Sequence, residues 1–212
     1  MTAKILAFAA SLQESPIPLN GQTPPKRVRN ADVRTREYLT PDEVDALMKA
    51  AKTMGRHSHR NETLILLAFR HGLRVSELVA LRWDQIELKR GVLHVTRNKN
   101  GSPSTHPLRG PELRALRRVK RDYPDSPYVF NTDRKGPIAA ASVRKIVAKA
   151  GESAGLGFPV HPHMLRHACG YKLANDGHDT RAIQQYLGHK NITHTVRYTE
   201  LSTDRFNGFW SD

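Results

Sequence analysis

The sequence has a single cysteine, Cys169, among its 212 residues. One thiol cannot form an internal disulfide, so the chain fits a reducing cytoplasm, and its apolar neighbours predict that Cys169 is packed rather than reactive. No apolar run approaches the roughly 18 residues that a membrane-spanning helix needs. The short apolar run from Ile5 to Ala10 is also shorter than the apolar segment of a secretory signal, so we expect no export.

Common metal-binding motifs are absent as well, because the sequence contains neither CxxC nor HExxH. Histidines occur close together at His161, His163, His167 and His178, but a helical spacing spreads them around the helix axis instead of gathering them on one side. We therefore expect no metal ion and no other cofactor.

Acidic residues are few: 20 Asp and Glu stand against 34 Lys and Arg, which gives a formal net charge of +14. Such a charge predicts a polyanionic partner. Nucleic acid is favoured over a membrane surface, because the basic residues are spread along the chain and do not flank one hydrophobic segment. Nucleic acid is therefore the partner that the charge predicts.

The length suits one main domain. We expect a basic, largely flexible arm at residues 1–36, a globular domain at 37–200 and a short tail at 201–212. The arm is rich in proline and carries the basic residues Lys26, Arg27 and Arg29. They can form a solvated linker or contact DNA phosphates, and the sequence leaves both interpretations open.

Local signals predict the elements of the globular domain. Thr40, Pro41 and Glu43 suit the start of a helix, and further helices are expected at 61–71, 110–122 and 139–150. The period then changes to that of strands from Gln85 to Leu108, with turns at 90–91 and 98–101. The fold class expected is α+β, mostly helical with a small antiparallel sheet. The helix at 139–150 exposes Arg144, Lys145 and Lys149, which are candidates for contacts with the DNA backbone or simply a solvated face.

Three segments carry side chains suited to phosphate chemistry. In Gly72-Leu-Arg-Val-Ser-Glu-Leu78, Glu77 lies one helical turn after Arg74 and can orient its guanidinium. In His161-Pro-His-Met-Leu-Arg-His167, His163 and Arg166 share a helix face at i and i+3. The third segment runs from Leu187 to Thr199, where a glycine suits the end of a helix and a tyrosine, Tyr198, follows the LGH element.

These three motifs together resemble the tyrosine site-specific recombinases of the phage integrase family, and most closely the fimbrial phase-switch invertases. The resemblance covers roughly residues 37 to 210. It implies the catalytic-domain fold of that family, and the proposed catalytic set is Arg74, Lys99, His163, Arg166, His189 and Tyr198.

The resemblance also implies a role for each of these residues. The two arginines bind the phosphate, His189 donates a hydrogen bond to it, and His163 accepts the tyrosine proton or binds the same phosphate. Tyr198 is the nucleophile that forms a 3′-phosphotyrosine, and we expect neighbouring cations to favour its phenolate. Lys99, on the hairpin, protonates the leaving 5′ oxygen. Glu77 and His167 are expected to contact and orient the catalytic side chains without touching the phosphate.

Alternatives remain at this level. Tyr171 and Tyr186 are rival nucleophiles, but both fall within predicted helices, where packing is the default. A DNA-binding regulator without catalysis, or a type IB topoisomerase, would share part of the pattern. The resemblance implies that the partner is double-stranded DNA and that a homotetramer acts on two synapsed sites. It also implies a location in the cytoplasm, with accessory DNA-bending proteins as further partners.

Overall fold

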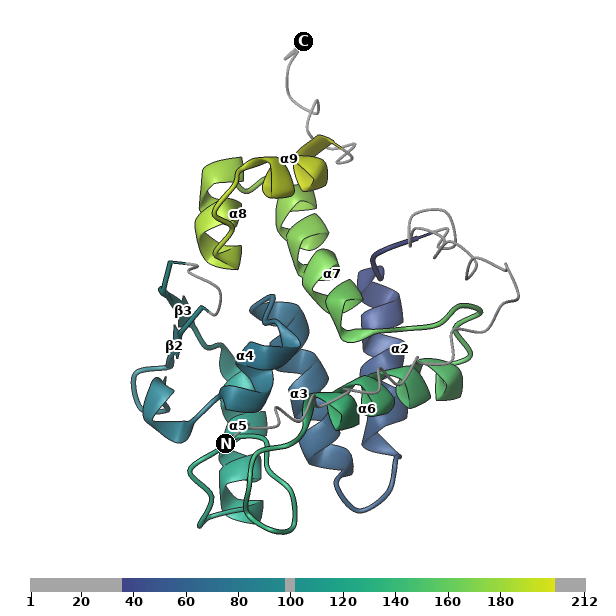
Figure 1. The fold of residues 1–212 in the computed structure, drawn as a ribbon, viewed down its shortest axis with the longest axis vertical. Coiled ribbons are helices and arrows are strands. Elements are labelled where there is room, and N and C mark those ends of the chain that lie inside the picture. The colour runs from purple at the N-terminus through teal and green to yellow at the C-terminus, as the bar shows by residue number, and fades with distance from the viewer. Residues whose placement is uncertain (1–35, 98–101, 201–212) are drawn as a thin grey trace, which may run out of the picture. The chain divides into compact units, whose positions relative to one another are not determined.

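The computed structural model describes residues 36–97 and 102–200, so the basic arm with Lys26, Arg27 and Arg29, the turn with Lys99 and the C-terminal tail lie outside the described residues. The described part is mostly helical and carries one three-stranded antiparallel sheet (Figure 1). This confirms the predicted fold class. The helices are α2 Pro41–Lys52, α3 Ser58–Arg70, α4 Val75–Ala80, the 3-10 turn η1 Trp83–Gln85, α5 Gly110–Asp122, α6 Ala140–Ser153, α7 Pro162–Asn175, α8 Thr180–Leu187 and α9 Thr193–Glu200.

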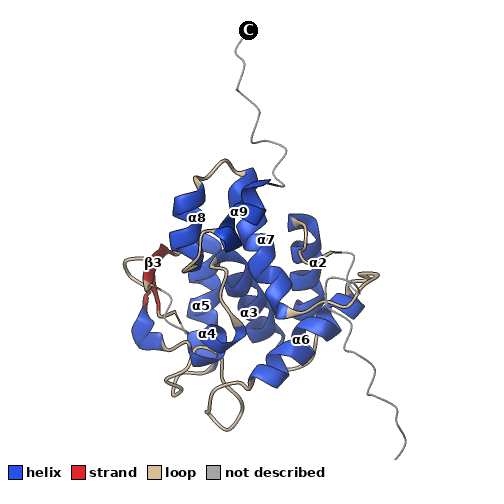
Figure 2. Cartoon of the chain, turned by 45° about the horizontal axis from the view of Figure 1, so that its top comes forward, coloured by secondary structure: helices blue, strands red, loops and turns tan. Residues whose placement is uncertain are grey.

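Helix α2 begins as its sequence predicts. The Thr40 backbone N–H donates to the Glu43 carboxylate at 2.8 Å, and the Glu43 N–H donates to the Thr40 hydroxyl at 3.3 Å, which completes a capping box. The apolar face, with Val44 and Leu47 fully buried, packs on α3 and α6. Helix α2 therefore fixes one side of the core (Figure 2).

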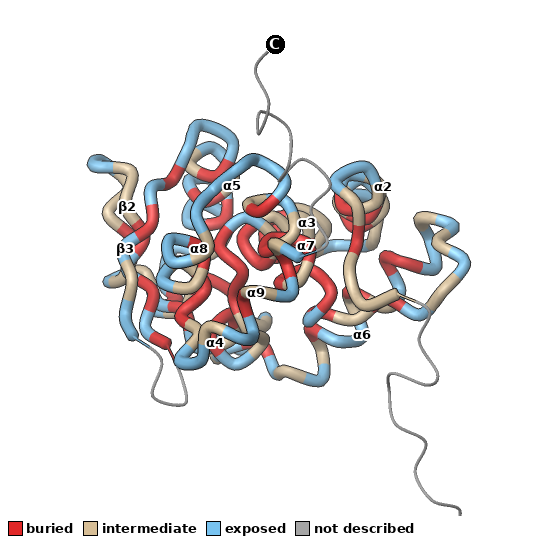
Figure 3. Tube along the Cα trace, turned by 90° about the horizontal axis from the view of Figure 1, so that it is seen from above, coloured by how far each residue is buried: buried red, intermediate tan, exposed pale blue. Residues whose placement is uncertain are grey.

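Helix α3 is the centre of the core. It begins at Ser58, three residues before the predicted start, without a side-chain cap, because its packing on α2, α5 and α7 stabilises the extra turn. Leu64, Ile65 and Leu67 are fully buried. Buried segments of the tube lie along α3 and α7, and exposed segments lie on the outer turns (Figure 3). Gly72, with a left-handed φ of 56°, turns the chain towards α4.

The sheet consists of β1 Ile86–Glu87, β2 Val92–Val95 and β3 Ser104–Pro107 in the order β1-β2-β3. Gly91 has the left-handed φ of 67° that the predicted turn needs. Strands β2 and β3 pair antiparallel, with Val92 opposite Pro107 and Val95 opposite Ser104. Strand β3 also contacts α8, so the sheet lies against the helical part of the domain.

The second half of the chain follows the predicted order of elements. Helix α5 has the predicted bounds, and α6 runs three residues past the predicted end because Ala150 and Gly151 are still buried in the core. Helix α7 contacts α3, α8 and α9, so it is the element that links the core to the C-terminal helices. None of the helices in the described part of the chain is long and apolar enough to span a membrane.

Candidate active site

Arg166 is the most deeply placed charge of the site. It lies on α7 with 1 % of its surface exposed, and its guanidinium donates to the backbone carbonyls of Gly72 and, at 2.7 Å, of Leu187. Burial, followed by repulsion from Arg74 and Arg97, lowers the Arg166 pKa to about 10. The group is still protonated at neutral pH, and two carbonyls at the ends of α3 and α8 hold it without neutralising it.

Arg74 is held by a carboxylate. It precedes α4, and Glu77 on the first turn accepts from the Arg74 side chain at 2.8 Å and from its backbone N–H at 2.9 Å. Burial would raise the Glu77 pKa, but the Arg74 backbone N–H and the Arg97 guanidinium hold it below its usual value. Glu77 therefore stays ionised and fixes the direction of Arg74.

Arg97 is a member of the cluster that the sequence reasoning missed. It follows β2, its side chain has no exposed surface, and it forms an ion pair with Glu77 at 2.9 Å. Its other terminal nitrogen donates to the backbone carbonyl of Tyr186. The signal for it was the period of the strand, because Leu93, Val95 and Arg97 alternate onto the same buried face.

The three guanidiniums form an uncompensated positive cluster. Arg74 and Arg97 both lower the Arg166 pKa, and Glu77 is the carboxylate that opposes them there. Three positive charges and one negative charge leave an excess of two; Arg97 and Arg166 are buried, whereas the Arg74 side chain is 29 % exposed and accessible to a ligand. Such an excess favours binding of an anion with oxygens to share, such as a phosphodiester.

His189 comes directly after the helix end at Gly188, whose φ of 65° confirms the predicted left-handed stop. The His189 Nδ1 lies 2.9 Å from the Thr195 hydroxyl. Burial, then the charges of Arg166 and Arg74, lowers the His189 pKa to about 3, so the ring is neutral. When the Thr195 hydroxyl donates to Nδ1, the ring proton lies on Nε2 and His189 can donate it to an anion.

His163 and His167 lie one turn apart on α7, with ring centroids 4.4 Å apart in an edge contact. His163 is exposed, yet desolvation and then the Arg166 charge lower its pKa to about 4. His167 has its pKa lowered to about 3, first by burial and then by His163. Both rings are therefore neutral at pH 7, and they are weak bases in the absence of a bound anion.

Tyr198 on α9 packs against α7 with 2 % of its surface exposed. Its hydroxyl lies 2.9 Å from Nδ1 of His167. The role of His163, to accept the tyrosine proton or to bind the same phosphate, stays a prediction. The expectation that cations favour the phenolate does not hold for the resting structure. Burial raises the Tyr198 pKa to about 12 and outweighs the opposing Arg166 charge. In the resting state Tyr198 is a neutral phenol that is hydrogen-bonded to His167.

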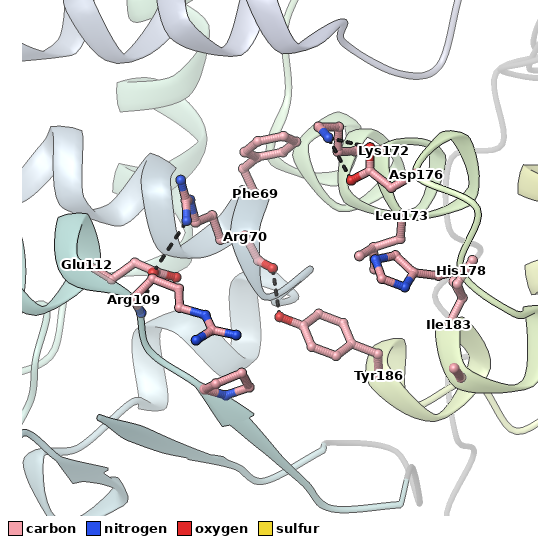
Figure 4. Close-up of a pocket in the computed structure, with 12 residues that line it drawn as sticks. Phe69, Arg70, Arg109, Glu112, Lys172, Leu173, Asp176, His178, Ile183 and Tyr186 are labelled. Carbon is pink, nitrogen blue, oxygen red and sulfur yellow. Dashed lines mark hydrogen bonds and ion pairs between the residues drawn. The ribbon is translucent and has the colours of Figure 1, made fainter. Parts of the chain in front are cut away.

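The two rival tyrosines have structural contacts. The Tyr186 hydroxyl donates to the Arg70 carbonyl at 2.9 Å (Figure 4), and its ring stacks on His106 with centroids 3.8 Å apart. Tyr171 lies against Tyr38 with ring centroids 4.1 Å apart. Both rings act as packing groups between elements.

Other predicted residues lie apart from this cluster or beyond the described chain. Arg144, Lys145 and Lys149 are exposed on α6. Cys169 is buried, and burial raises the pKa of its thiol to about 12, which confirms a packed thiol. Lys99 lies outside the described residues, so its assignment stays a prediction. Among residues 36–97 and 102–200, no group of three or more His, Cys, Asp or Glu side chains could hold a metal ion.

Comparisons with known proteins agree with this geometry. The phage integrase family model matches residues 37–205. The type 1 fimbriae regulatory proteins FimB and FimE of Escherichia coli (strain K12) are 45 % and 44 % identical, over 85 % and 82 % of this chain and 92 % and 91 % of their own length. The crystal structure of XerA recombinase is 26 % identical with a TM-score of 0.70, covering 81 % of this chain and 63 % of that one. The chain therefore belongs to the phage integrase family and is a tyrosine recombinase.

Proposed function

We propose that Tyr198 is the nucleophile of a site-specific DNA recombinase and that Arg74 and Arg166 bind the phosphate it attacks. The observation that carries this proposal is that the charge of Arg166 acts on the Tyr198 hydroxyl and on three neutral histidines, while Arg74 and Arg97 share one carboxylate beside it. Phosphate binding alone has no need of a tyrosine, whereas strand cleavage and rejoining needs a nucleophile beside fixed positive charge.

In the reaction, the Tyr198 oxygen forms a bond to phosphorus as the bond from phosphorus to the 5′ oxygen breaks. The tyrosine proton passes to His167, whose Nδ1 is already 2.9 Å from the hydroxyl. The negative charge of the bound phosphate opposes the arginine charges that help to lower the His167 pKa, and so makes His167 a stronger base. Arg74 and Arg166 share the charge that develops on the non-bridging oxygens, and His189 donates a further hydrogen bond. The 5′ oxygen takes its proton from Lys99, and the product is a 3′-phosphotyrosine. Reversal on a new 5′ hydroxyl rejoins the strand without an external energy source.

The raised pKa of Tyr198 has a place in this scheme. In the absence of DNA the phenol is buried and protonated, so it is a poor nucleophile. Attack requires that the ring reach the phosphate and lose its proton in the same step. Burial therefore keeps the nucleophile inactive until a phosphate occupies the arginine cluster.

A suicide DNA substrate tests the assignment. Cleavage next to a nick releases a short fragment that carries the 5′ hydroxyl, so the strand cannot be rejoined. The covalent adduct therefore accumulates and can be quantified on a denaturing gel. The Tyr198→Phe variant should bind the DNA as wild type does and form no adduct. An adduct of normal yield in this variant would show that another residue attacks.

We further propose that a homotetramer joins two DNA sites and that the tail, residues 201–212, docks on a neighbouring subunit. The tail lies outside the described residues; its sequence carries Phe206, Phe209 and Trp210 at i, i+3, i+4, a spacing that is typical of one face of a helix. The support for DNA as partner is the net charge of +14 together with the family. Arg144, Lys145 and Lys149 are the proposed backbone contacts.

A further inference from the structure

Arg97 is a buried charge to which the reaction scheme gives no role. Its side chain has no exposed surface, and it joins three elements that are distant in sequence. It leaves the end of β2, pairs with Glu77 on α4 and donates to the Tyr186 carbonyl on α8. A buried ion pair often contributes little net stability, because the desolvation of both charges offsets their attraction. A role in stability alone therefore explains this arrangement poorly.

The contact with Glu77 adds a charged donor to the carboxylate that orients Arg74. The Arg74 guanidinium binds one carboxylate oxygen, Oε1, at 2.8 Å, while the other, Oε2, accepts from the Arg74 backbone N–H and from Arg97, both at 2.9 Å. The guanidinium of Arg97 is the charged donor of the two on Oε2, and a hydrogen bond from a charged donor is the stronger. Arg97 therefore strengthens the hold on the carboxylate that directs the Arg74 guanidinium, although the two arginines repel each other.

The second contact fixes the end of α8. Arg97 binds the carbonyl of Tyr186, and the next carbonyl, that of Leu187, holds Arg166. The following residue, Gly188, lies against the Arg97 side chain so closely that a Cβ there would be 2.8 Å from Cγ and 2.9 Å from Nε of Arg97. His189 comes directly afterwards. Arg97 thus determines where the chain turns before it presents His189.

We propose that Arg97 is a positioning residue for strand cleavage, which holds Arg74 through Glu77 and His189 through the end of α8, without touching the phosphate itself. This inference rests on the proposed function, because it assumes that Arg74 and His189 act on the scissile phosphate. Loss of the Arg97 side chain disturbs the arrangement of the groups around the non-bridging oxygens and leaves the DNA-binding surface in place.

The direct test replaces Arg97 and measures single-turnover cleavage of the suicide substrate at saturating DNA. The Arg97→Met variant keeps the bulk of the side chain and loses both contacts, and we expect a fall of about 100-fold in the cleavage rate with little change in DNA affinity, as for a misplacement of about 1 Å. The Arg97→Lys variant keeps the charge and loses the fork, so its rate should be intermediate. Cleavage at the wild-type rate in both variants would overturn the proposal.

A matched control separates positioning from stability. Arg60 is also buried, with 7 % of its surface exposed, and donates at 2.6 Å to the Asn131 carbonyl and otherwise to the Asn61 side chain, none of which holds Arg74, Arg97 or Arg166. The Arg60→Met variant should lower the melting temperature and leave the cleavage rate close to wild type. If Arg97→Met does not fold, the same comparison is made with Arg97→Lys. A loss of rate in Arg60→Met as large as that of the Arg97 variant would reduce the effect to destabilisation and overturn the proposal.

Two further measurements locate the effect. The first uses a substrate with sulfur in place of the 5′-bridging oxygen, whose leaving group needs no proton. This substrate restores the rate only when the defect lies in protonation of the leaving group. We expect the Arg97 variants to remain slow on it, because their defect lies around the non-bridging oxygens. A defect that disappears on this substrate would assign Arg97 to the leaving group and refute the inference.

The second measurement uses a double variant. Combined with Glu77→Gln, the Arg97→Met change should add little further loss of cleavage rate, because both act through one carboxylate. Fully multiplicative losses would count against it.

The proposed function fails in a different way. It fails if wild-type protein forms no adduct or if the Tyr198→Phe variant does. The Arg97 inference is judged from the relative rates of variants that retain Tyr198.

Discussion

Gly170 on α7 offers the sharpest test of where Tyr198 must lie. A Cβ at this position would be 2.5 Å from Cε2 and 2.7 Å from both Cδ2 and Cζ of the Tyr198 ring. Ordinary contacts between carbon atoms are about 3.5 to 4 Å, so in the Gly170→Ala variant the ring must retreat by about 1 Å. A displacement of that size costs on the order of 100-fold in rate when the group is a reacting one. We therefore expect about a 100-fold loss of adduct formation from a single methyl group.

Stability should change much less than activity. Alanine is favoured over glycine inside a helix by about 1 kcal/mol, which offsets part of the cost of the displaced ring. The assay is single-turnover cleavage of the suicide substrate, with a melting curve and a gel shift on the same samples. The Gly136→Ala variant is the control, since a Cβ there has no neighbour within 4 Å. Cleavage by Gly170→Ala at the rate of Gly136→Ala would refute the view that this contact sets the position of the nucleophile.

Three other predictions concern acid, metal and the tail. His106 is fully buried with its pKa lowered to about 3, first by burial and then by His71 and Arg97, so the neutral form stabilises the fold above pH 6.5 and this stability is lost as the pH falls below it. Urea unfolding should give a lower free energy at pH 5 than at pH 7.5, and this drop should be about 2 kcal/mol smaller in His106→Gln than in wild type; an equal drop in both proteins would contradict this. Cleavage should persist in excess EDTA, because arginines and histidines supply the positive charge, and a loss that added magnesium or zinc restores would contradict it. Deleting residues 203–212 should leave binding to one site and abolish pairing of two sites on native gels, whereas loss of one-site binding would assign the tail to its own subunit.

Elements with local signals were predictable from the sequence. The capping box at Thr40 and the left-handed glycines at Gly91 and Gly188 were identified because each depends on residues within one turn of chain. The beginning of α3 at Ser58 was not, because packing against other helices, and not a cap, stabilises that turn. The order of the elements could be predicted, but bounds that depend on tertiary contacts could not.

The candidate site divides in the same way. Spacing on a helix identified His163 and Arg166, but it could not decide which histidine on that face reaches Tyr198, since α9 is placed by packing. The sequence showed cations near Tyr198 and gave no measure of how deeply the ring is buried, so the direction of its pKa shift was wrong. Arg97 was missed because a charged residue at the end of a strand is usually exposed.

The way in which Arg166 is held has a consequence for how the protein tolerates change. Its partners are the carbonyl oxygens of Gly72 and Leu187, which every residue possesses whatever its side chain. A substitution that preserves the backbone cannot remove these carbonyls, so Arg166 keeps its hydrogen bonds when side chains around it change. Arg74 depends instead on a single side chain, Glu77, that one nucleotide change can remove. Among natural variants, losses of activity should therefore gather at Glu77. Residues that hold Arg166 should tolerate more side-chain change, except at Gly72, where a Cβ would lie 2.4 Å from Cδ2 of Leu187.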